Sequence, residues 1–160
     1  MAKFNSIDDY LEHLQETVLE ASLTSLTHYT STVLADIMID EINEQVYKAY
    51  EGTYERRENL GGLTDRENIN IVEVIMKDKK LHVLVRNTTL GAGDDAGRYI
   101  DAIIVNGVGY TWERSKIYKA EQKGKPIKRD FYAPTREVIE DLIRSDFIAR
   151  MRLLCNIHLK

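Results

Sequence analysis

The chain of 160 residues contains one cysteine, two prolines and one tryptophan, and its scarce metal-ligating residues exclude several kinds of site. Because Cys155 has no second cysteine to pair with, an intrachain disulfide framework is excluded. No two of the four histidines have the four-residue spacing of a helical zinc site, and one cysteine cannot complete a Cys/His cluster. We therefore expect neither a metal nor a bound cofactor.

Long hydrophobic runs are also absent. The longest uninterrupted apolar run, residues 102–105, is far shorter than the roughly 20 residues that a membrane-spanning helix needs. The first residues, Met-Ala-Lys-Phe-Asn-Ser, contain no apolar stretch of the signal-peptide type. The sequence therefore predicts no membrane span and a protein made in the cytoplasm of its host.

Sequence motifs of nucleotide and hydrolytic enzymes are missing as well. Gly107-x-Gly109 has no third glycine at position 112 and no helix signal after it, so it lacks the pattern of a dinucleotide-binding loop. Neither a Gly-x-Ser-x-Gly elbow nor a Gly-Lys-Ser/Thr loop occurs. We predict no catalytic residues, and we interpret the two glycines as positive-φ positions of a turn or bulge between strands.

The sequence also allows one catalytic alternative. His82 lies within a predicted strand beside Arg86, and Glu73 can face it across a predicted hairpin. A histidine and a carboxylate within hydrogen-bond reach form a general acid/base pair. A small hydrolase or nuclease using His82 and Glu73 is therefore the alternative from a different functional class.

What the sequence does contain is a strong division of charge. The first 50 residues hold nine acidic residues and two lysines, a net charge of −7, so the other 110 residues carry +3 of the total of −4. Opposite charges on two parts of a chain can attract neighbouring subunits to each other, although solvated helix faces give the same pattern. The acidic residues are Asp8, Asp9, Glu12, Glu16, Glu20, Asp36, Asp40, Glu41 and Glu44.

The spacing of apolar residues predicts helices at both ends of the chain. From Ile7 to Tyr50 they recur mostly three or four apart, after Ser6, which can cap a helix. The Ser/Thr-rich residues 22–32 predict either a break into two helices or one long helix with a soft middle. Gly52 is expected to end this helical arm, and a final helix is expected from Thr135 onward.

Between the helices, β-branched runs predict strands. Residues 69–76 and 81–87 form the expected hairpin, and residues 98–105 the expected third strand. Tyr110 to Trp112 either continue as a strand or begin an excursion that runs to about residue 124. The predicted fold is α+β, with a long or broken N-terminal helix, a small, mainly antiparallel sheet and a C-terminal helix packed on it. We predict one domain, with a helical arm over 1–52, the sheet region with insertion loops over 53–133, and the last helix over 134–160.

Residues 110–132 combine lysines, arginines and aromatic side chains. Such a combination is typical of single-strand nucleic-acid binding, but acidic residues interrupt it here. We therefore favour a surface that docks on a partner protein, and keep a nucleic-acid-binding module as an alternative. The residues predicted to lie at a subunit interface are Arg56, Arg57, Tyr110, Trp112, Lys116, Tyr118, Arg129 and Phe131.

The order of these short motifs resembles the neck and tail-completion proteins of long-tailed bacteriophages. An acidic helix leads to Gly61-Gly62-Leu63, two strands end in Val85-Arg86-Asn87-Thr88, and a run from Tyr99 to Gly109 follows. Then Lys125-Pro126-Ile127-Lys128-Arg129-Asp130-Phe131 enters the closing helix. The similarity covers roughly residues 40–155.

This resemblance implies a virion structural protein without enzymatic activity. It implies a homo-oligomeric ring, six- or twelve-fold, between the portal complex and the tail, in contact with other head-completion and tail proteins. DNA would pass through the lumen without specific binding. A tail terminator that caps the tail tube is the nearby alternative.

Overall fold

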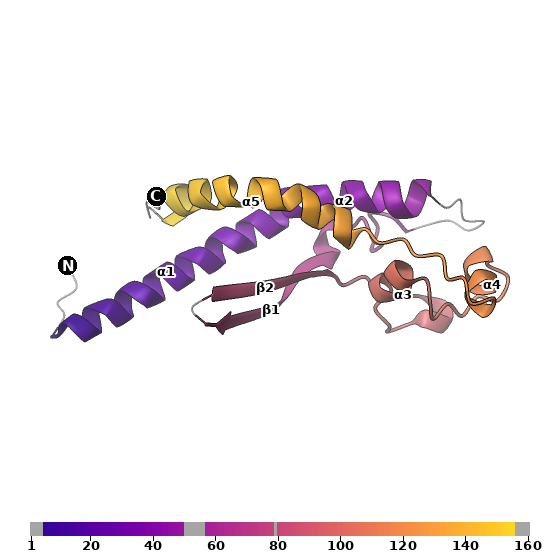
Figure 1. Ribbon diagram of the computed structural model, residues 1–160, viewed down its shortest axis with the longest axis horizontal. Helices are drawn as coiled ribbons and strands as arrows, with labels where there is room; N and C mark the ends of the chain where they lie inside the picture. The colour runs from indigo at the N-terminus through magenta and orange to yellow at the C-terminus, as the bar shows by residue number, and fades with distance from the viewer. Residues whose placement is uncertain (1–4, 50–56, 79, 156–160) are drawn as a thin grey trace. The chain divides into compact units, whose positions relative to one another are not determined.

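The computed structural model describes residues 5–49, 57–78 and 80–155. The chain divides into two compact units, one within residues 1–29 and 140–160, the other spanning residues 30–139. Its architecture is α+β, as the sequence predicts: in sequence order, a long helical segment comes first, then a two-stranded antiparallel sheet, and a long helix comes last (Figure 1).

The N-terminal arm is helical from Ile7 to Lys48. It consists of α1 (Ile7–Tyr29), a π-helical segment (Thr30–Leu34), α2 (Ala35–Ile42) and a second π-helical segment (Asn43–Lys48). The Oγ of Ser6 accepts a hydrogen bond from the Asp9 N–H at 3.0 Å, as a capping residue does. The predicted stop at Gly52 lies outside the described residues.

The Ser/Thr-rich stretch is helical, and two of its hydroxyl groups bond back to the helix. Ser22 and Thr24 each donate to the carbonyl oxygen four residues earlier, at 2.7 and 2.9 Å, as Thr17 does before the stretch, at 2.8 Å. Such bonds satisfy the side chain without interrupting the ladder, although they locally loosen the helix. The π-helical turn follows directly, at Thr30, where the first compact unit also ends. One long helix with a soft middle is therefore the correct alternative.

The hairpin is found where the sequence predicts it. Strand β1 (Ile69–Lys77) pairs antiparallel with β2 (Lys80–Asn87), with a bulge between Ile71 and Glu73. One face of the hairpin, called the inner face below, carries alternate residues of β2, among them Val85 and the buried Asn87. Asn87 pairs with the buried Ile69 of β1. Towards the tip this face becomes exposed, so the body of the unit covers only the base of the hairpin.

The predicted third strand is wrong, because residues 101–105 of the segment are helical. They belong to α3 (Asp101–Asn106), which ends at Gly107 with φ +69°. Ile103 and Ile104 are buried, and the Arg129 N–H donates to the Ile104 carbonyl at 3.2 Å. Tertiary packing overrides the β preference of the Ile-Ile-Val run. The glycines do have positive φ, as predicted, but Gly107 ends a helix and does not connect two strands.

The residues after Gly109 form an excursion and not another strand. It contains a short helix, α4 (Lys116–Gln122), which is absent from the sequence-based prediction. The Ser115 Oγ accepts from the Tyr118 N–H at 2.9 Å, and Gly124, with φ +68°, follows the helix. Both are ordinary helix boundary signals.

The last helix, α5 (Tyr132–Cys155), begins slightly earlier than predicted because Asp130 caps it. The Asp130 Oδ1 accepts from the N–H groups of Tyr132 and Ala133.

Within the first unit, the Arg150 guanidinium of α5 lies over the Tyr29 ring of α1, 5.5 Å from its centroid. In the second unit the buried apolar residues are Leu34, Ala35, Met38, Ile42, Val46, Leu63, Ile69, Ile103, Ile104, Ile117 and Phe131.

Candidate functional site

A buried carboxylate joins three elements of the second unit. Asp101, at the start of α3, accepts two hydrogen bonds from Arg86 of β2, at 2.6 and 2.7 Å. The hydroxyl of Tyr132 donates to the same carboxylate at 2.8 Å. Arg86 also lies over the Tyr99 ring, 4.6 Å from its centroid. Because the Asp101 side chain is only 4% exposed, a bidentate pair with this geometry fixes α3 and the start of α5 to the end of β2.

The neighbouring residues extend this polar network to the glycine-containing loop before β1. The Asn87 side chain donates to the Leu63 carbonyl at 2.7 Å, and the Asn87 N–H donates to the Tyr132 hydroxyl at 2.9 Å. The Thr89 hydroxyl lies 3.0 Å from the Gly62 carbonyl and 2.6 Å from the Asn87 Oδ1. Asn87 and Thr89 are fully buried, so their hydrogen bonds specify one arrangement of loop and strand.

The shifted pKa values of Asp101 and Tyr132 suit a structural role better than a role in proton transfer. Burial raises the pKa of the Asp101 carboxyl, but the hydrogen bonds from Arg86 and Tyr132 outweigh burial, and its pKa lies below the ordinary 3.8. Burial also raises the pKa of the Tyr132 phenol well above its ordinary 10.0. At neutral pH the carboxylate therefore stays ionised and the phenol stays protonated, which makes both poor proton shuttles.

The stability of the protein is expected to fall as the pH is lowered below about 3.8, the ordinary pKa of Asp101. Because the folded pKa is lower than the unfolded one, the unfolded chain binds this proton first, and acid favours unfolding. Urea unfolding at a series of pH values measures the effect. Asp101→Asn should flatten the pH dependence, and an unchanged slope in that variant would contradict the assignment.

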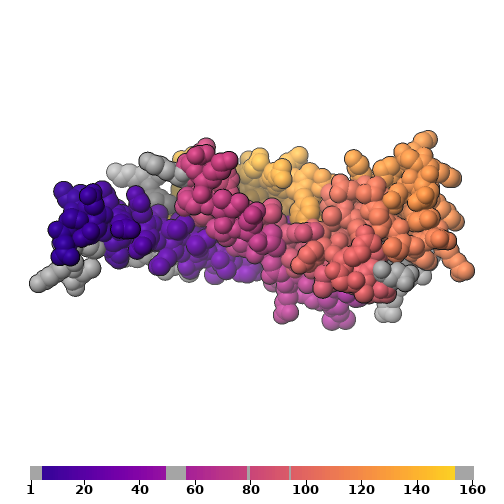
Figure 2. Space-filling view, turned by 90° about the horizontal axis from the view of Figure 1, so that it is seen from below, coloured from indigo at the N-terminus to yellow at the C-terminus, as the bar shows by residue number. Residues whose placement is uncertain are grey.

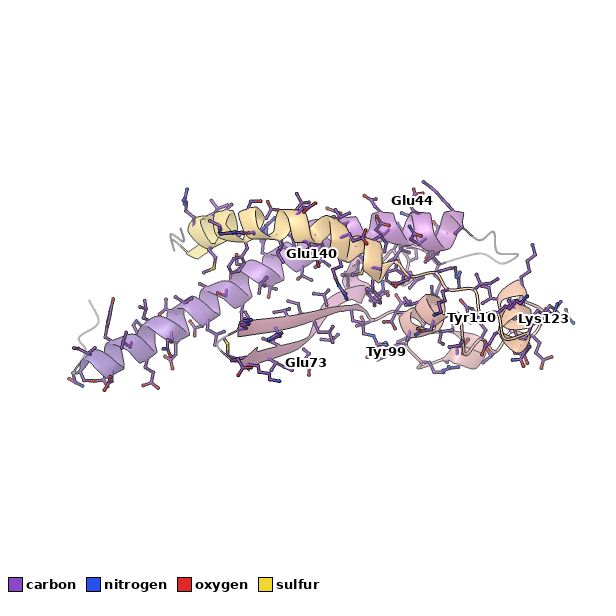
Figure 3. The ribbon with its side chains drawn as sticks, viewed as in Figure 1. Glu44, Glu73, Tyr99, Tyr110, Lys123 and Glu140 are labelled. Carbon is purple, nitrogen blue, oxygen red and sulfur yellow. The ribbon has the colours of Figure 1, made fainter. Side chains whose placement is uncertain are left out.

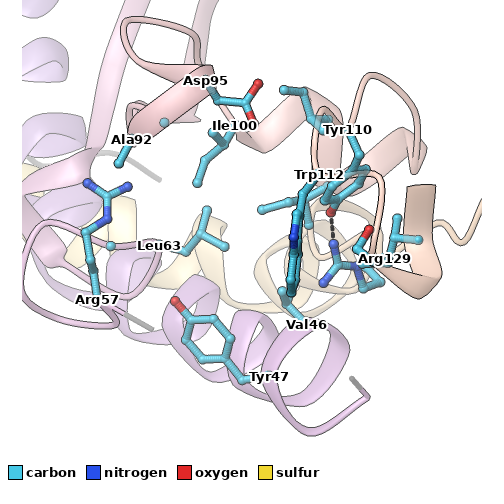
Figure 4. Close-up of a pocket in the computed structure, with 16 residues that line it drawn as sticks. Val46, Tyr47, Arg57, Leu63, Ala92, Asp95, Ile100, Tyr110, Trp112 and Arg129 are labelled. Carbon is cyan, nitrogen blue, oxygen red and sulfur yellow. Dashed lines mark hydrogen bonds between the residues drawn. The ribbon is translucent and has the colours of Figure 1, made fainter. Parts of the chain in front are cut away.

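The second unit also contains an apolar cavity of about 400 Å³ (Figure 4). Leu63, Ile100 and Ile104 line it on the side of the loop and α3, and Val46 lines it on the side of the N-terminal arm. Trp112 lies at the cavity and is 41% exposed, so this aromatic ring is accessible from solvent. Cavities of this size and lining accept apolar groups from a ligand or a partner.

Two arginines lie at the cavity and give it positive charge. The Arg57 guanidinium donates to the Leu90 carbonyl at 2.5 Å. Arg129 is bonded to the Tyr110 hydroxyl (Figure 4), and its guanidinium carbon lies 5.7 Å from the centroid of that ring. Asp95 is the acidic residue among those that line the cavity.

The predicted interface residues differ in how far they are exposed. Trp112 and Lys116 are exposed and Tyr118 is partly exposed, so these side chains are open to a partner. Phe131 is fully buried, packed beside Tyr132 with ring centroids 4.4 Å apart, and Arg129 is 8% exposed. These two shape the site from within. Arg57 and Tyr110 line the cavity, and Arg56 lies outside the described residues.

A strongly basic segment, residues 114–129, borders this cavity. It contains seven lysines and arginines and one acidic residue, and six of the seven basic side chains are exposed. The acidic residue, Glu121, accepts from the N–H groups of Gly109 and Tyr110 at 3.0 and 3.4 Å. The exposed part is therefore almost purely positive. Figure 3 shows Lys123 directly after α4. The exposed basic residues are Arg114, Lys116, Lys119, Lys123, Lys125 and Lys128.

The first half of α1 is acidic, in contrast to the basic segment, and also carries exposed apolar side chains. Ile7, Leu11, Leu14 and Val18 recur at alternating spacings of four and three residues and are 36% to 78% exposed. They form one apolar stripe on the helix. All five charged residues between positions 7 and 20 are acidic. In Figure 2 this part of α1, coloured indigo, lies at the surface.

The residues of the catalytic alternative do not form a pocket with one another. Glu73 and His82 lie on the outer face of the hairpin, where both are exposed (Figure 3 labels Glu73). Arg86, on the same face, is bonded to Asp101. None of the three lines the cavity. No observation adds support to the hydrolase or nuclease alternative, which stays a prediction.

Over residues 5–49, 57–78 and 80–155, no group of three His, Cys, Asp or Glu residues is placed to hold a metal ion. Within the same residues, none of the helices combines the length and apolarity required to cross a bilayer.

Comparison with known proteins identifies a family that this chain matches over most of its length. The family model described as YomN matches residues 10–153 of the chain, and therefore spans the polar network, the cavity, the basic segment and most of α1. No curated protein and no solved structure matches the chain.

Proposed function

Because the chain belongs to the YomN family of phage-associated proteins, we propose that it is a structural subunit of the phage neck. In this role it forms a ring between the portal complex and the tail, and it contacts other head-completion and tail proteins. The order of its short motifs, similar to that of neck and tail-completion proteins, supports this position in the particle.

The observation that carries the proposal is the uncovered apolar stripe of α1. Four large apolar side chains on one face of a helix are costly to leave in water, and their exposure is typical of a surface that a partner covers. The exposed apolar residues Val74 and Met76, on one face of the hairpin towards its tip, indicate a second contact surface. A chain with several such surfaces suits an assembly in which each subunit has more than one neighbour.

The charge division explains why a ring is the favoured assembly. A contact between an acidic part of one subunit and a basic part of the next joins two different surfaces. Such heterologous contacts leave one free surface of each kind on every dimer, so addition continues until the ring closes. An acidic lumen surface would in addition let DNA pass without sticking to it.

The test is the position of this protein in the phage particle. Gold or fluorescent labels attached to it are expected at the junction of head and tail, and particles made without it are expected to contain heads and tails that are not joined. Labels at the tail end of the neck, above the last tube ring, would favour the tail terminator instead. Labels absent from purified particles would refute both positions.

A further inference from the structure

We infer that the apolar stripe of α1 pairs with the same stripe of a second copy of the chain, with the two helices antiparallel. Residues 5–18 are all exposed, and in Figure 1 the first turns of α1 extend past the end of α5. A two-fold pair closes at two copies, so this contact is separate from one that builds a ring. It concerns the free protein, goes beyond the proposed neck position and does not depend on it.

The spacing of the stripe is that of a seam between two helices. Its four residues are separated by four, three and four positions, which keeps them on a line along one side of the helix. A second helix that meets this line can place its side chains between them, as in a coiled coil. Ser25 and Tyr29 lie within about 30° of the same line and are buried. The exposed stripe therefore extends a face that α1 already uses for packing.

The charges of α1 permit this contact because most of them point away from it. At about 100° per residue, four of the five acidic residues between positions 7 and 20 lie about 130° to 170° from the centre of the stripe. Of the four positions that flank the stripe, at about 70° to 90°, three are uncharged. The fourth is Asp8, which an antiparallel pair places near opposite ends of the two helices. The four acids are Asp9, Glu12, Glu16 and Glu20, and the uncharged flanking residues are Tyr10, Gln15 and Thr17.

The position of α5 selects the antiparallel orientation. The Arg150 guanidinium of α5 lies over the Tyr29 ring, on the side of α1 that carries the stripe. In a parallel pair, the α5 helices of both copies would lie between the two α1 helices and force them apart. An antiparallel partner meets only the exposed half of α1 and continues past its N-terminal end, away from α5. The stripe is then covered along its whole exposed length without a clash.

A lipid surface is the competing occupant of this amphipathic helix. Helices that lie on membranes commonly carry lysine and arginine on the polar face, where they attract anionic lipids. Residues 7–20 carry five acidic residues and no lysine or arginine. An anionic membrane would repel this polar face, which favours the second copy and makes lipid binding an outcome of the test.

Disulfide cross-linking tests both the contact and its direction. In a Cys155→Ser background, one full-length protein carries Ile7→Cys and another carries Val18→Cys. Antiparallel pairing of the two stripes places position 7 of one copy opposite position 18 of the other. An equimolar mixture in a glutathione buffer should therefore form the mixed disulfide, which needs Cα atoms within about 7 Å. The two copies of position 7 lie roughly 16 Å apart along the pair, so each protein alone should not cross-link.

The dimerisation constant gives an independent measure. Four side chains per copy form a smaller contact than a standard interface, so sedimentation equilibrium should show a dimer that dissociates at micromolar concentrations. Leu11→Ala with Leu14→Ala removes the centre of the seam and should weaken dimerisation by at least about 100-fold. The matched control, Asp9→Ala with Glu16→Ala, changes the opposite face of the same helix and should stay within about threefold of the unaltered chain. Circular dichroism should show native helix content in every variant.

Several outcomes would overturn the inference. They are an unaltered chain that stays monomeric at every concentration, cross-linking of each single-cysteine protein alone, and equal dimerisation of the leucine variant and its control. Binding to phosphatidylcholine–phosphatidylglycerol vesicles that the leucine variant loses, without self-association, would assign the stripe to lipid. Labels in the particle test the neck position separately, so either proposal can fail while the other stands.

Discussion

Gly107→Ala is expected to lower the free energy of unfolding by more than about 3 kcal/mol. Two costs combine at this position. Gly107 has φ +69°, where an alanine costs about 1 to 2 kcal/mol, and an added Cβ would lie 2.3 Å from the carbonyl oxygen of Ile127. That oxygen belongs to the backbone of the segment that leads to α5, so it cannot move aside as a side chain can. Urea unfolding followed by circular dichroism measures the loss.

Gly124→Ala is the matched control for this substitution. Gly124 has nearly the same φ, +68°, but an added Cβ would meet nothing within 4 Å. Only the conformational cost of about 1 to 2 kcal/mol applies there. Equal losses for the two variants would show that the close approach of Gly107 to Ile127 does not occur in solution.

Asp101→Asn is expected to cost about 2 to 3 kcal/mol of unfolding free energy. Removing one partner of a buried ion pair leaves the other charge uncompensated, which costs about 3 to 5 kcal/mol for fully buried pairs. Arg86 is about one third exposed, so water partly solvates its charge and lowers the expected cost. The asparagine keeps the shape of the side chain, so the loss reports charge and hydrogen bonding.

A double variant separates the ion pair from other effects of the substitution. Adding Arg86→Met to Asp101→Asn removes the unpaired charge, so the combined loss should be smaller than the sum of the two single losses. Asp40→Asn, at an exposed position of α2, should change stability by less than about 0.5 kcal/mol. Additive losses in the double variant would mean that Arg86 and Asp101 do not interact in solution.

The sequence predicts the hairpin and the long helices because their signals are local. Residues 69–87 combine two β-branched runs with a short polar connection, and the structure contains this hairpin. The helical spacing from Ile7 onward and the cap at Ser6 are confirmed in the same way. Each of these elements depends on neighbours within a few positions along the chain.

The prediction failed at α3 because the deciding contacts are distant in sequence. Ile103 and Ile104 belong to a run that favours a strand by composition. Asp101 is held by Arg86 and Tyr132, 15 and 31 positions away, and Gly107 packs on Ile127. One local signal was available, since an acidic residue precedes the run and a glycine follows it, as at the two ends of a short helix.

The candidate site was only partly accessible from sequence. The sequence predicts Trp112 and Lys116 at a subunit interface, and in the structure both side chains are exposed. The polar network of Asp101, Asn87 and Tyr132 was missed, because nothing in the local pattern shows that a carboxylate, an amide and a phenol from separate segments meet. The apolar cavity was missed for the same reason.

The bulge in the hairpin has a geometric consequence of its own. Ile71 pairs with Val85 and Glu73 with Leu84, so Val72 is one residue more than the ladder requires. A strand lacking Val72 would match every remaining partner and keep every side chain on its present face. Val72 therefore does not set the register of the two strands. As a bulge residue it increases the local twist of the hairpin, and so sets the direction in which the tip of the hairpin points. Inserting or deleting one residue at this bulge can therefore change the direction of the hairpin tip without changing any residue at the tip.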